Sequence, residues 1–304
     1  MKIGIVDIGT NSVRLLIPNK EELISSKKYM EITRIGEGVN ESKMLSELAM
    51  NRTIDGIKKL IEVCKNNNVD KIYAMATSAV RDAANKDVFL SRVHKQTGVH
   101  IEVLSGEDEA RMGYIGVITG LNDMMENSCL IIDIGGGSTE LIEVDEGELV
   151  KMKSFDIGAV RLTEKFKLSD PPKQIEIDAM KDYIDVVIGK YLKNVRAVAI
   201  GIGGTITTIS SIKNQLEKYE REKIHGSIIR KENIDGLFNR LINMTNDERR
   251  NVVGLDALRA DIINAGILIL QRILIMIESE SVIVSDYDNL EGYYHEKNVV
   301  DKDD

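Results

Sequence analysis

A segment of strand, glycine-rich turn and strand occurs twice in this chain, and this repeat most limits the folds open to it. Residues 130–144 read LIIDIGGGSTELIEV, so an apolar run ends at Asp133, a turn follows, and apolar residues resume. Residues 5–17 read IVDIGTNSVRLLI and repeat the pattern, with Asp7 matching Asp133 at an offset of 126 residues. Each copy predicts two strands joined by a tight turn.

A second pair of segments follows the same repeat. At nearly the same offset, the apolar residues 71–75 and the small residues after them align with residues 198–202 and the glycines after those. Two strand-and-loop pairs in one order indicate an internal duplication. The duplication predicts two similar α/β domains that each present phosphate-binding loops to a shared cleft.

The residue types in these turns suit phosphate. Glycine adopts positive φ angles and, because it has no Cβ, lets backbone N–H groups approach an oxyanion closely. The turn is not a Walker A loop, since no Gly-Lys-Ser/Thr follows it, and it lacks GxGxxG spacing. Gly203 to Thr205 open a predicted helix, which makes a second, generic anion site. For one such turn taken alone, a β-hairpin without a ligand stays the alternative.

Composition bounds the class of protein. A length of 304 residues fits about two domains. The formal charge of −9 and the absence of tryptophan argue against a nucleic-acid partner, because nucleic acids select basic faces and aromatic platforms. Cys64 and Cys129 lack CxxC spacing and predict reduced, buried thiols. With no secretory leader, and with polar residues inside the apolar segment 262–277, we expect a cytoplasmic protein without a membrane partner.

Strands and helices alternate along both halves. The patterns predict a strand over residues 23–35 and helices over residues 46–66, 83–97, 105–120, 175–191 and 257–277. The highly charged residues 217–250 indicate a solvated helical flank. No linker separates the halves, so the helix 105–120 is the predicted hinge. We expect domains of residues 1–124 and 125–304, and we allow the last residues to pack back on the first domain.

The hinge helix carries its own start signal. Ser105 and Asp108 form a capping-box pattern, and Glu107, Asp108 and Glu109 all lie in the first helical turn. Acids are favoured there by the helix dipole, so capping alone accounts for Glu107 and Asp108. Glu109 lies one step further in.

Seven motifs in a fixed order give the chain a family resemblance. They are DIGTNSVRLLI, ATSAVRDAAN, SGEDEAR, DIGGGSTEL, GAVRLTEKF, GIGGTITT and RADIINAG. Together they resemble the exopolyphosphatase and guanosine pentaphosphate phosphohydrolase family over nearly the whole chain. The resemblance implies a short member with two ribonuclease-H-like domains of the actin-like ATPase superfamily, flanking a phosphate-binding cleft.

The resemblance also implies roles for individual residues. Glu109 matches the proposed catalytic base, and Arg81 matches an arginine near the phosphates. Asp133 and Glu140 match carboxylates that position magnesium and water, with Asp7 as a further metal ligand. The implied phosphate-binding residues are Thr10, Asn11, Ser12, Arg14, Gly135, Gly136, Gly137, Ser138, Gly203, Gly204 and Thr205.

Hydrolysis of a phosphoanhydride needs these residue types whether or not the family resemblance holds. Hydrolysis of a terminal phosphoanhydride needs an aligned water, a carboxylate to take its proton, and N–H groups or cations to bear charge on the phosphoryl oxygens. Magnesium held by carboxylates and phosphate oxygens supplies much of that charge. The resemblance implies Mg²⁺ as cofactor, with K⁺ as an optional second ion, and a homodimer.

Several of these residues also have a structural interpretation. Asp7 and Asp133 stand at strand ends before turns, where aspartate forms Asx turns. Arg81 can pair with its neighbour Asp82, and Arg14 can lie on the surface of a strand. For a single residue, such an interpretation stays open at the level of sequence.

The function that we expect is magnesium-dependent release of terminal phosphate from inorganic polyphosphate. Hydrolysis of the 5′ phosphate of pppGpp at the same site is the first alternative, and a nucleotide-sensing regulator with little turnover is another. The acids at 109, 133 and 140 weigh against a regulator.

Two features near the C-terminal end qualify the resemblance. The family pattern VSDxGLREG reads VSDYDNLEG here, so Asp288, Asn289 and Leu290 replace glycine, leucine and arginine and make the segment less suited to a polyanion. His225 and Gly226 resemble a family HG pair near the substrate path, with a purely structural histidine as the alternative.

Overall fold

The computed structural model describes residues 1–121 and 128–303, and it contains two compact units. Unit 1 comprises Met1–Gly116 together with Asn289–Asp304, and unit 2 comprises Val117–Asp288. The predicted domain boundary between residues 124 and 125 lies outside the described residues and stays a prediction. The C-terminal segment from Asn289, which we had placed in the second domain while allowing it to pack back, belongs to unit 1.

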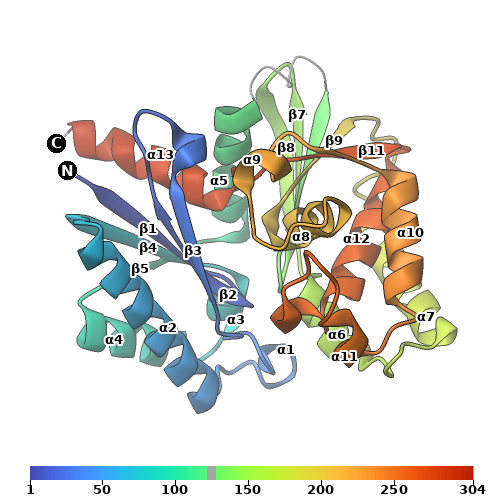
Figure 1. Ribbon diagram of the computed structural model, residues 1–304, viewed down its shortest axis with the longest axis horizontal. Helices are drawn as coiled ribbons and strands as arrows, with labels where there is room; N and C mark the ends of the chain where they lie inside the picture. Colours follow the sequence, from blue (N-terminus) through green and yellow to red (C-terminus); the bar gives the residue numbers. More distant parts are fainter. Residues whose placement is uncertain (122–127, 304) are drawn as a thin grey trace. The chain divides into compact units, whose positions relative to one another are not determined.

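Unit 1 is built on a five-stranded sheet in the order β3-β2-β1-β4-β5 (Figure 1). β1, β2 and β3 are antiparallel neighbours, whereas β1, β4 and β5 are parallel. The strands are β1 (Ile3–Ile8), β2 (Ser12–Ile17), β3 (Lys27–Ile32), β4 (Lys71–Ala76) and β5 (Ile101–Val103).

Unit 2 repeats this sheet and extends it by one strand. Its order, β8-β7-β6-β9-β11-β10, matches that of unit 1 strand for strand up to β11. The strands are β6 (Cys129–Ile134), β7 (Thr139–Asp145), β8 (Glu148–Phe155), β9 (Val198–Ile202), β10 (Ile228–Arg230) and β11 (Ser281–Val284). Shared strand order and direction in both units confirm the predicted pair of ribonuclease-H-like α/β domains.

The helices of unit 1 cover its sheet. They are α1 (Val39–Ser42), α2 (Glu47–Asn66), α3 (Ser78–Asp82), α4 (Lys86–Thr97), α5 (Gly106–Leu121, which runs on into unit 2) and α13 (Asn289–Asp303). Helix α2 confirms the helix predicted at 46–66: Ser46 caps it by accepting the Ala49 N–H, and its apolar face is buried. Ser105 likewise accepts the Asp108 N–H at 3.0 Å, so the N-cap of the predicted capping box at α5 is present; the Asp108 carboxylate accepts from the Ser105 hydroxyl at 2.7 Å and does not reach the Ser105 backbone N–H.

Two predictions in unit 1 were too simple. The helix predicted over 83–97 is α4 and begins three residues later, and it is preceded by the short helix α3, which the sequence patterns did not predict; Ala83 takes an extended conformation between the two. The strand predicted over 23–35 contains a 3₁₀ turn, η1 (Leu23–Ser25), before β3. In both places a local turn interrupts an otherwise continuous apolar pattern.

The helices of unit 2 surround a core centred on one apolar helix. They are α6 (Ala159–Phe166), α7 (Gln174–Ile188), α8 (Gly203–Lys213), α9 (Arg221–Ile224), α10 (Lys231–Leu241), α11 (Asn246–Arg249), η3 (Ala257–Arg259) and α12 (Ile263–Met276). Nearly all of α12 is buried, as expected of a core helix. The single helix predicted over 257–277 is therefore η3 followed by α12, and the charged segment 217–250 contains the short strand β10 that we missed.

Helix α13 was also missed, because its sequence is largely polar. Three apolar side chains at its start, Leu290, Tyr293 and Tyr294, are nonetheless buried in the core of unit 1 beside β1. Gly292 lies directly against the backbone carbonyl of Met112 in α5, where any Cβ would overlap it. The close crossing of two helices thus depends on one glycine.

The structure confirms the expectation for the two cysteines. Cys64 and Cys129 are free and buried, and burial raises the pKa of each thiol to about 11. Within the described parts of the chain, every helix is too short or too polar to span a bilayer.

Candidate active site

The two repeated turns close in the same way. In unit 1 the Gly9 N–H donates to the Ser12 carbonyl at 2.9 Å, and in unit 2 the Gly135 N–H donates to the Ser138 carbonyl at 3.0 Å. Each turn joins the first two strands of its sheet, at equivalent registers. The sequence repeat is therefore a structural repeat down to the bond that shapes the loop.

A later segment of unit 1 satisfies the carbonyl groups of the first turn. The Asn11 carbonyl accepts from the Thr33 N–H at 3.0 Å and from the Arg34 N–H at 2.9 Å. The Thr10 carbonyl accepts from the Gly36 N–H at 2.9 Å. Gly36 lies so close to Thr10 that a Cβ would overlap the threonine methyl group.

The second turn is supported in the same manner by the start of α6. The Gly136 carbonyl accepts from the Val160 N–H at 2.9 Å and from the Arg161 N–H at 3.0 Å. Gly158 faces the Gly136 carbonyl at a distance that leaves no room for a Cβ. Arg161 also donates its Nε–H to the Gly137 carbonyl at 2.6 Å.

These contacts use the carbonyls and leave N–H groups unused. Within residues 1–121 and 128–303, the backbone N–H groups of Thr10 and Asn11 donate to no protein acceptor, and the same holds for Gly136 and Gly137. The four positions correspond pairwise in the repeat. Consecutive free N–H groups on a tight turn form the donor set that binds phosphate oxygens.

Two buried polar side chains accompany these N–H groups. The amide group of Asn11 and the hydroxyl of Ser138 are 6% and 1% exposed, and neither has a hydrogen-bond partner among the described residues. Burial of a polar group without a partner is costly. An oxyanion bound at either turn would give the polar group of that turn a partner. Ser12 also belongs to the predicted phosphate-binding set. Its carbonyl closes the first turn, and its buried side chain lies at the start of β2.

The third predicted loop opens helix α8. Gly203 has a positive φ of 84°, and a Cβ there would overlap the Asp133 carboxylate. Gly204 lies under the guanidinium of Arg259 in the same way. Thr205 is buried, and its side chain packs on Gly266 of α12. The predicted N-terminal anion site thus has Asp133 on one side and Arg259 on another, all within unit 2.

Asp133 and Glu140 are cross-strand partners on β6 and β7. Opposed residues of an antiparallel pair have Cβ atoms about 5 Å apart on one face of the sheet. Both side chains are buried, and Glu140 accepts a hydrogen bond from the Ser154 hydroxyl at 2.7 Å. Two adjacent buried carboxylates are a donor set that suits a hard divalent cation.

The equivalent pair in unit 1 is an ion pair instead. Asp7 and Arg14 are cross-strand partners on β1 and β2, and Arg14 Nη2 lies 2.6 Å from Asp7 Oδ2, with Nε at 3.0 Å from the same oxygen. Asp7 is buried and Arg14 half-buried. Arg14 thus neutralises the aspartate that we had listed among the metal ligands.

Glu109 is a buried acid of unit 1 with a raised pKa. It is 6% exposed, and Arg81 Nη1 donates to Glu109 Oε2 at 2.9 Å. Burial raises the pKa of the Glu109 carboxyl, while the Arg81 guanidinium and a hydrogen bond from Thr77 lower it and the charge of Asp7 raises it further. The net result is a raised pKa, which suits a general base that works near neutral pH.

Arg81 is oriented toward the protein. Besides Glu109 it donates to the Leu104 carbonyl at 3.2 Å, and its Nε lies 3.8 Å from Asp82. The neighbouring Ser78 shares a 2.8 Å hydrogen bond with Thr10 of the first turn. Helix α3 therefore holds both the turn and the candidate base, and its arginine positions Glu109.

Two arginines at the glycine loops were missed. Arg161 contacts the second turn and Arg259 covers Gly204. Both lie inside motifs that the sequence had already singled out, GAVRLTEKF and RADIINAG. Their place inside these motifs was the available signal.

His225 has structural contacts. Its Nδ1 accepts from the Asp286 N–H at 3.3 Å, so in a neutral ring the proton lies on Nε2, 3.1 Å from the Gly120 carbonyl. Asp286 in turn pairs with Arg221 and Tyr219. Two residues that differ from the family pattern at VSDYDNLEG are packed inside the fold. Asp288 is buried in unit 2, and Leu290 is in the core of unit 1.

Two ribonuclease-H-like units, whose turns leave backbone donors unused beside buried carboxylates, define an enzyme that acts on phosphate groups. The chain belongs to the Ppx/GppA phosphatase family, whose profile matches residues 20–298. The order of motifs, the fold and this match agree.

Relatives show how far the similarity extends. The bifunctional 3-dehydroquinate synthase/phosphatase of Fusobacterium nucleatum is 37% identical over 302 residues, which cover 94% of this chain. This chain spans only 45% of that protein. Exopolyphosphatase 2 of Mycobacterium tuberculosis (strain H37Rv) is 29% identical over 96% of this chain and 97% of its own length. The crystal structure of an exopolyphosphatase from Cytophaga hutchinsonii matches with a TM-score of 0.88 at 30% identity, covering 97% of both chains.

The raised pKa of Glu109 predicts a pH-dependent stability. Its folded-state pKa lies above the unfolded value of 4.5, so its protonated form stabilises the fold below pH 4.5, and that contribution is lost as the pH rises through the folded-state pKa. Glu109→Gln, which mimics the protonated acid, should therefore exceed the wild type in unfolding free energy at pH 8 and equal it at pH 4. Urea denaturation at both pH values measures this. The exposed Glu107→Gln should match the wild type within about 0.5 kcal/mol at both, and a destabilised Glu109→Gln at pH 8 would contradict the assignment.

Proposed function

We propose that this chain hydrolyses the terminal phosphoanhydride bond of inorganic polyphosphate. The observation that carries the proposal is the set of four unused backbone N–H groups, two in each repeated turn, with Asn11 and Ser138 beside them. All of these groups suit phosphate oxygens. The similarity to exopolyphosphatase 2 over nearly its whole length supports the same substrate.

Glu109 is the proposed general base. In the reaction, a water oxygen forms a bond to the terminal phosphorus while the bond from that phosphorus to the bridging oxygen breaks. The water proton passes to the Glu109 carboxylate, and the shortened chain leaves with the bridging oxygen. Arg81 fixes the carboxylate, and burial keeps its proton affinity high. The unused N–H groups of the turns would stabilise the negative charge on the phosphoryl oxygens by hydrogen bonding.

Magnesium fits Asp133 and Glu140 better than Asp7. Mg²⁺ is commonly held by one or two carboxylates, with substrate phosphates and water completing its shell. The described residues contain no group of three or more His, Cys, Asp or Glu side chains arranged to hold a metal ion, so we propose a two-carboxylate site. When bound, the ion would polarise the phosphoryl oxygens. Asp7 already pairs with Arg14. A homodimer and a cytoplasmic location stay predictions.

A comparison of substrates tests the function. Phosphate release should be measured side by side for polyphosphate chains of several lengths, pppGpp and ATP, with magnesium present. The highest kcat/KM should be on polyphosphate. Faster release from pppGpp would favour the guanosine pentaphosphate hydrolase, and nucleotide binding without release from any substrate would favour a regulator.

Glu109→Gln tests the base. Loss of a general base typically costs about 10²–10⁴-fold in rate, so kcat on polyphosphate should fall by that factor while the affinity for polyphosphate is retained. Glu107→Gln is the matched control, because Glu107 lies two residues away in the same helical turn and is exposed. It should keep the wild-type kcat, and a Glu109→Gln enzyme with the same activity would exclude Glu109 as base.

Substitution of the carboxylate pair tests the metal site. Asp133→Asn and Glu140→Gln should each raise the magnesium concentration needed for half-maximal phosphate release, and chelation with EDTA should stop the wild-type reaction. Glu143→Gln, on the same strand as Glu140 but paired with Lys151, is the control and should leave the magnesium requirement unchanged. Equal magnesium curves for all variants would place the ion elsewhere.

A further inference from the structure

A hollow of about 640 Å³ lies in unit 1 at the opposite end of the sheet from the first turn. It is bounded by the start of β1 and the end of β2, including Ile3 and Ile17. β1 runs from Ile3 to Ile8, a span of roughly 17 Å at the usual rise per residue. The hollow is therefore separate from the turn at Gly9 and from Glu109, and nothing in the proposed function uses it.

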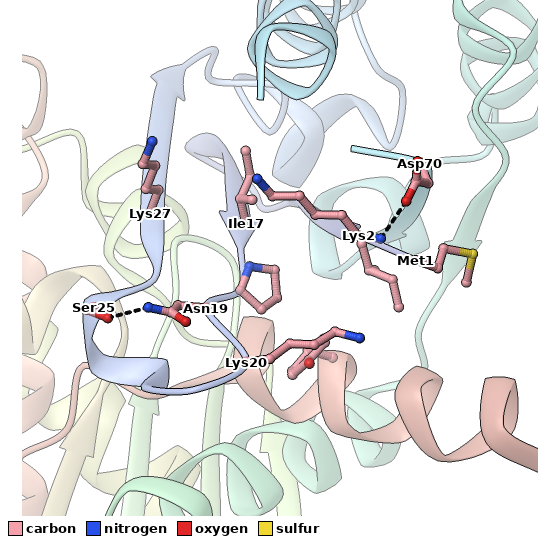
Figure 2. Close-up of a pocket in the computed structure, with 11 residues that line it drawn as sticks. Met1, Lys2, Ile17, Asn19, Lys20, Ser25, Lys27 and Asp70 are labelled. Atoms are coloured by element: carbon pink, nitrogen blue, oxygen red, sulfur yellow. Dashed lines mark hydrogen bonds between the residues drawn. The ribbon is translucent and has the colours of Figure 1, made fainter. Parts of the chain in front are cut away.

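Three lysines surround the hollow from three separate segments (Figure 2). Lys2 precedes β1, Lys20 follows β2, and Lys27 begins β3. Lys2 Nζ donates to the Asn67 carbonyl at 2.8 Å, and Lys27 Nζ donates to the Asn67 side-chain oxygen at 3.1 Å. Both ammonium groups are thus held by neutral oxygens, and each keeps two of its three donors for another partner.

The charge of these lysines is not balanced locally. Among the described residues that line the hollow, Asp70 is the one carboxylate, and its Oδ2 accepts the backbone N–H of Lys2 at 2.7 Å. Among the described residues, Lys2, Lys20 and Lys27 form no ion pair. Three lysines border one hollow in a chain whose net charge is −9, which creates a local positive potential there.

Part of the lining of the hollow is apolar. Ile3, Ile17, Pro18 and Tyr294 are buried side chains that line it. A volume of this size is typical of sites for small organic molecules, which pair an apolar wall with a few convergent polar groups. Lysine acts on phosphate as a point charge and does not require the fork geometry of arginine.

We propose that this hollow is a second ligand site, which takes a small organic diphosphate or triphosphate. The lysines would contact the phosphate oxygens, and the wall of Ile17, Pro18 and Tyr294 would cover the organic body. An inorganic phosphate chain would leave that wall without a partner. The proposal does not depend on the proposed hydrolase activity.

Calorimetric titration with ADP tests the site. ADP should bind, and Lys20→Glu should weaken its affinity by at least about tenfold, because a contact with a charged group is lost and repulsion is added. Lys95→Glu is the matched control: it makes the same charge change on an exposed residue of unit 1 outside the hollow, and it should leave the affinity unchanged. Equal losses in both variants, or no binding of ADP, would overturn the proposal.

Two further probes separate the parts of the ligand. Adenosine lacks the charge and pyrophosphate lacks the organic body, so each should bind at least tenfold more weakly than ADP. Hydrogen exchange with ADP bound should slow at residues 2–3 and 17–20; slowing confined to residues 9–12 would move the site to the turn and refute the proposal. The Glu109→Gln variant should bind ADP as the wild type does, so failure of the hydrolase proposal leaves this test intact.

Discussion

Each candidate phosphate loop depends on a hairpin turn whose carbonyl groups accept hydrogen bonds from a later segment of the same unit. A backbone turn carries donors and acceptors in equal number, and burying either without a partner is costly. In unit 1 the segment around Gly36 supplies N–H groups to the turn carbonyls, and in unit 2 the start of α6 at Gly158 does the same. The turn N–H groups therefore have no protein acceptor. We propose that they bind the substrate phosphate.

The two copies share this backbone but differ at one register position. Arg14 faces Asp7 in unit 1, and Glu140 faces Asp133 in unit 2. The first pair is neutral overall, whereas the second carries two acids on neighbouring strands. One duplicated hairpin thus gives one site that suits a cation and one that does not. In unit 1 the carboxylate that we propose as the general base is Glu109, which pairs with Arg81 and comes from a helix outside the repeat.

Patterns short in sequence were predictable, and contacts across the fold were not. The repeat at Asp7 and Asp133 predicted the matching hairpins of the two sheets, and the N-cap pattern at Ser105 predicted the start of α5. Burial of Glu109 against Arg81 joins residues 28 positions apart, so its raised pKa has no sequence signal. The same holds for Arg259 over Gly204. Helix α13 was missed because its few core residues lie in a polar stretch whose partner strand is at the other end of the chain.

That last helix has a consequence for how the chain acquires its structure during synthesis. Unit 2 is one continuous segment, so all of its core strands are synthesised in one uninterrupted stretch. The core of unit 1 needs Tyr293 and Tyr294 against strands made almost three hundred residues earlier. Domains generally fold as units during synthesis. The core of unit 1 therefore cannot be completed until the residues of unit 2 have been translated.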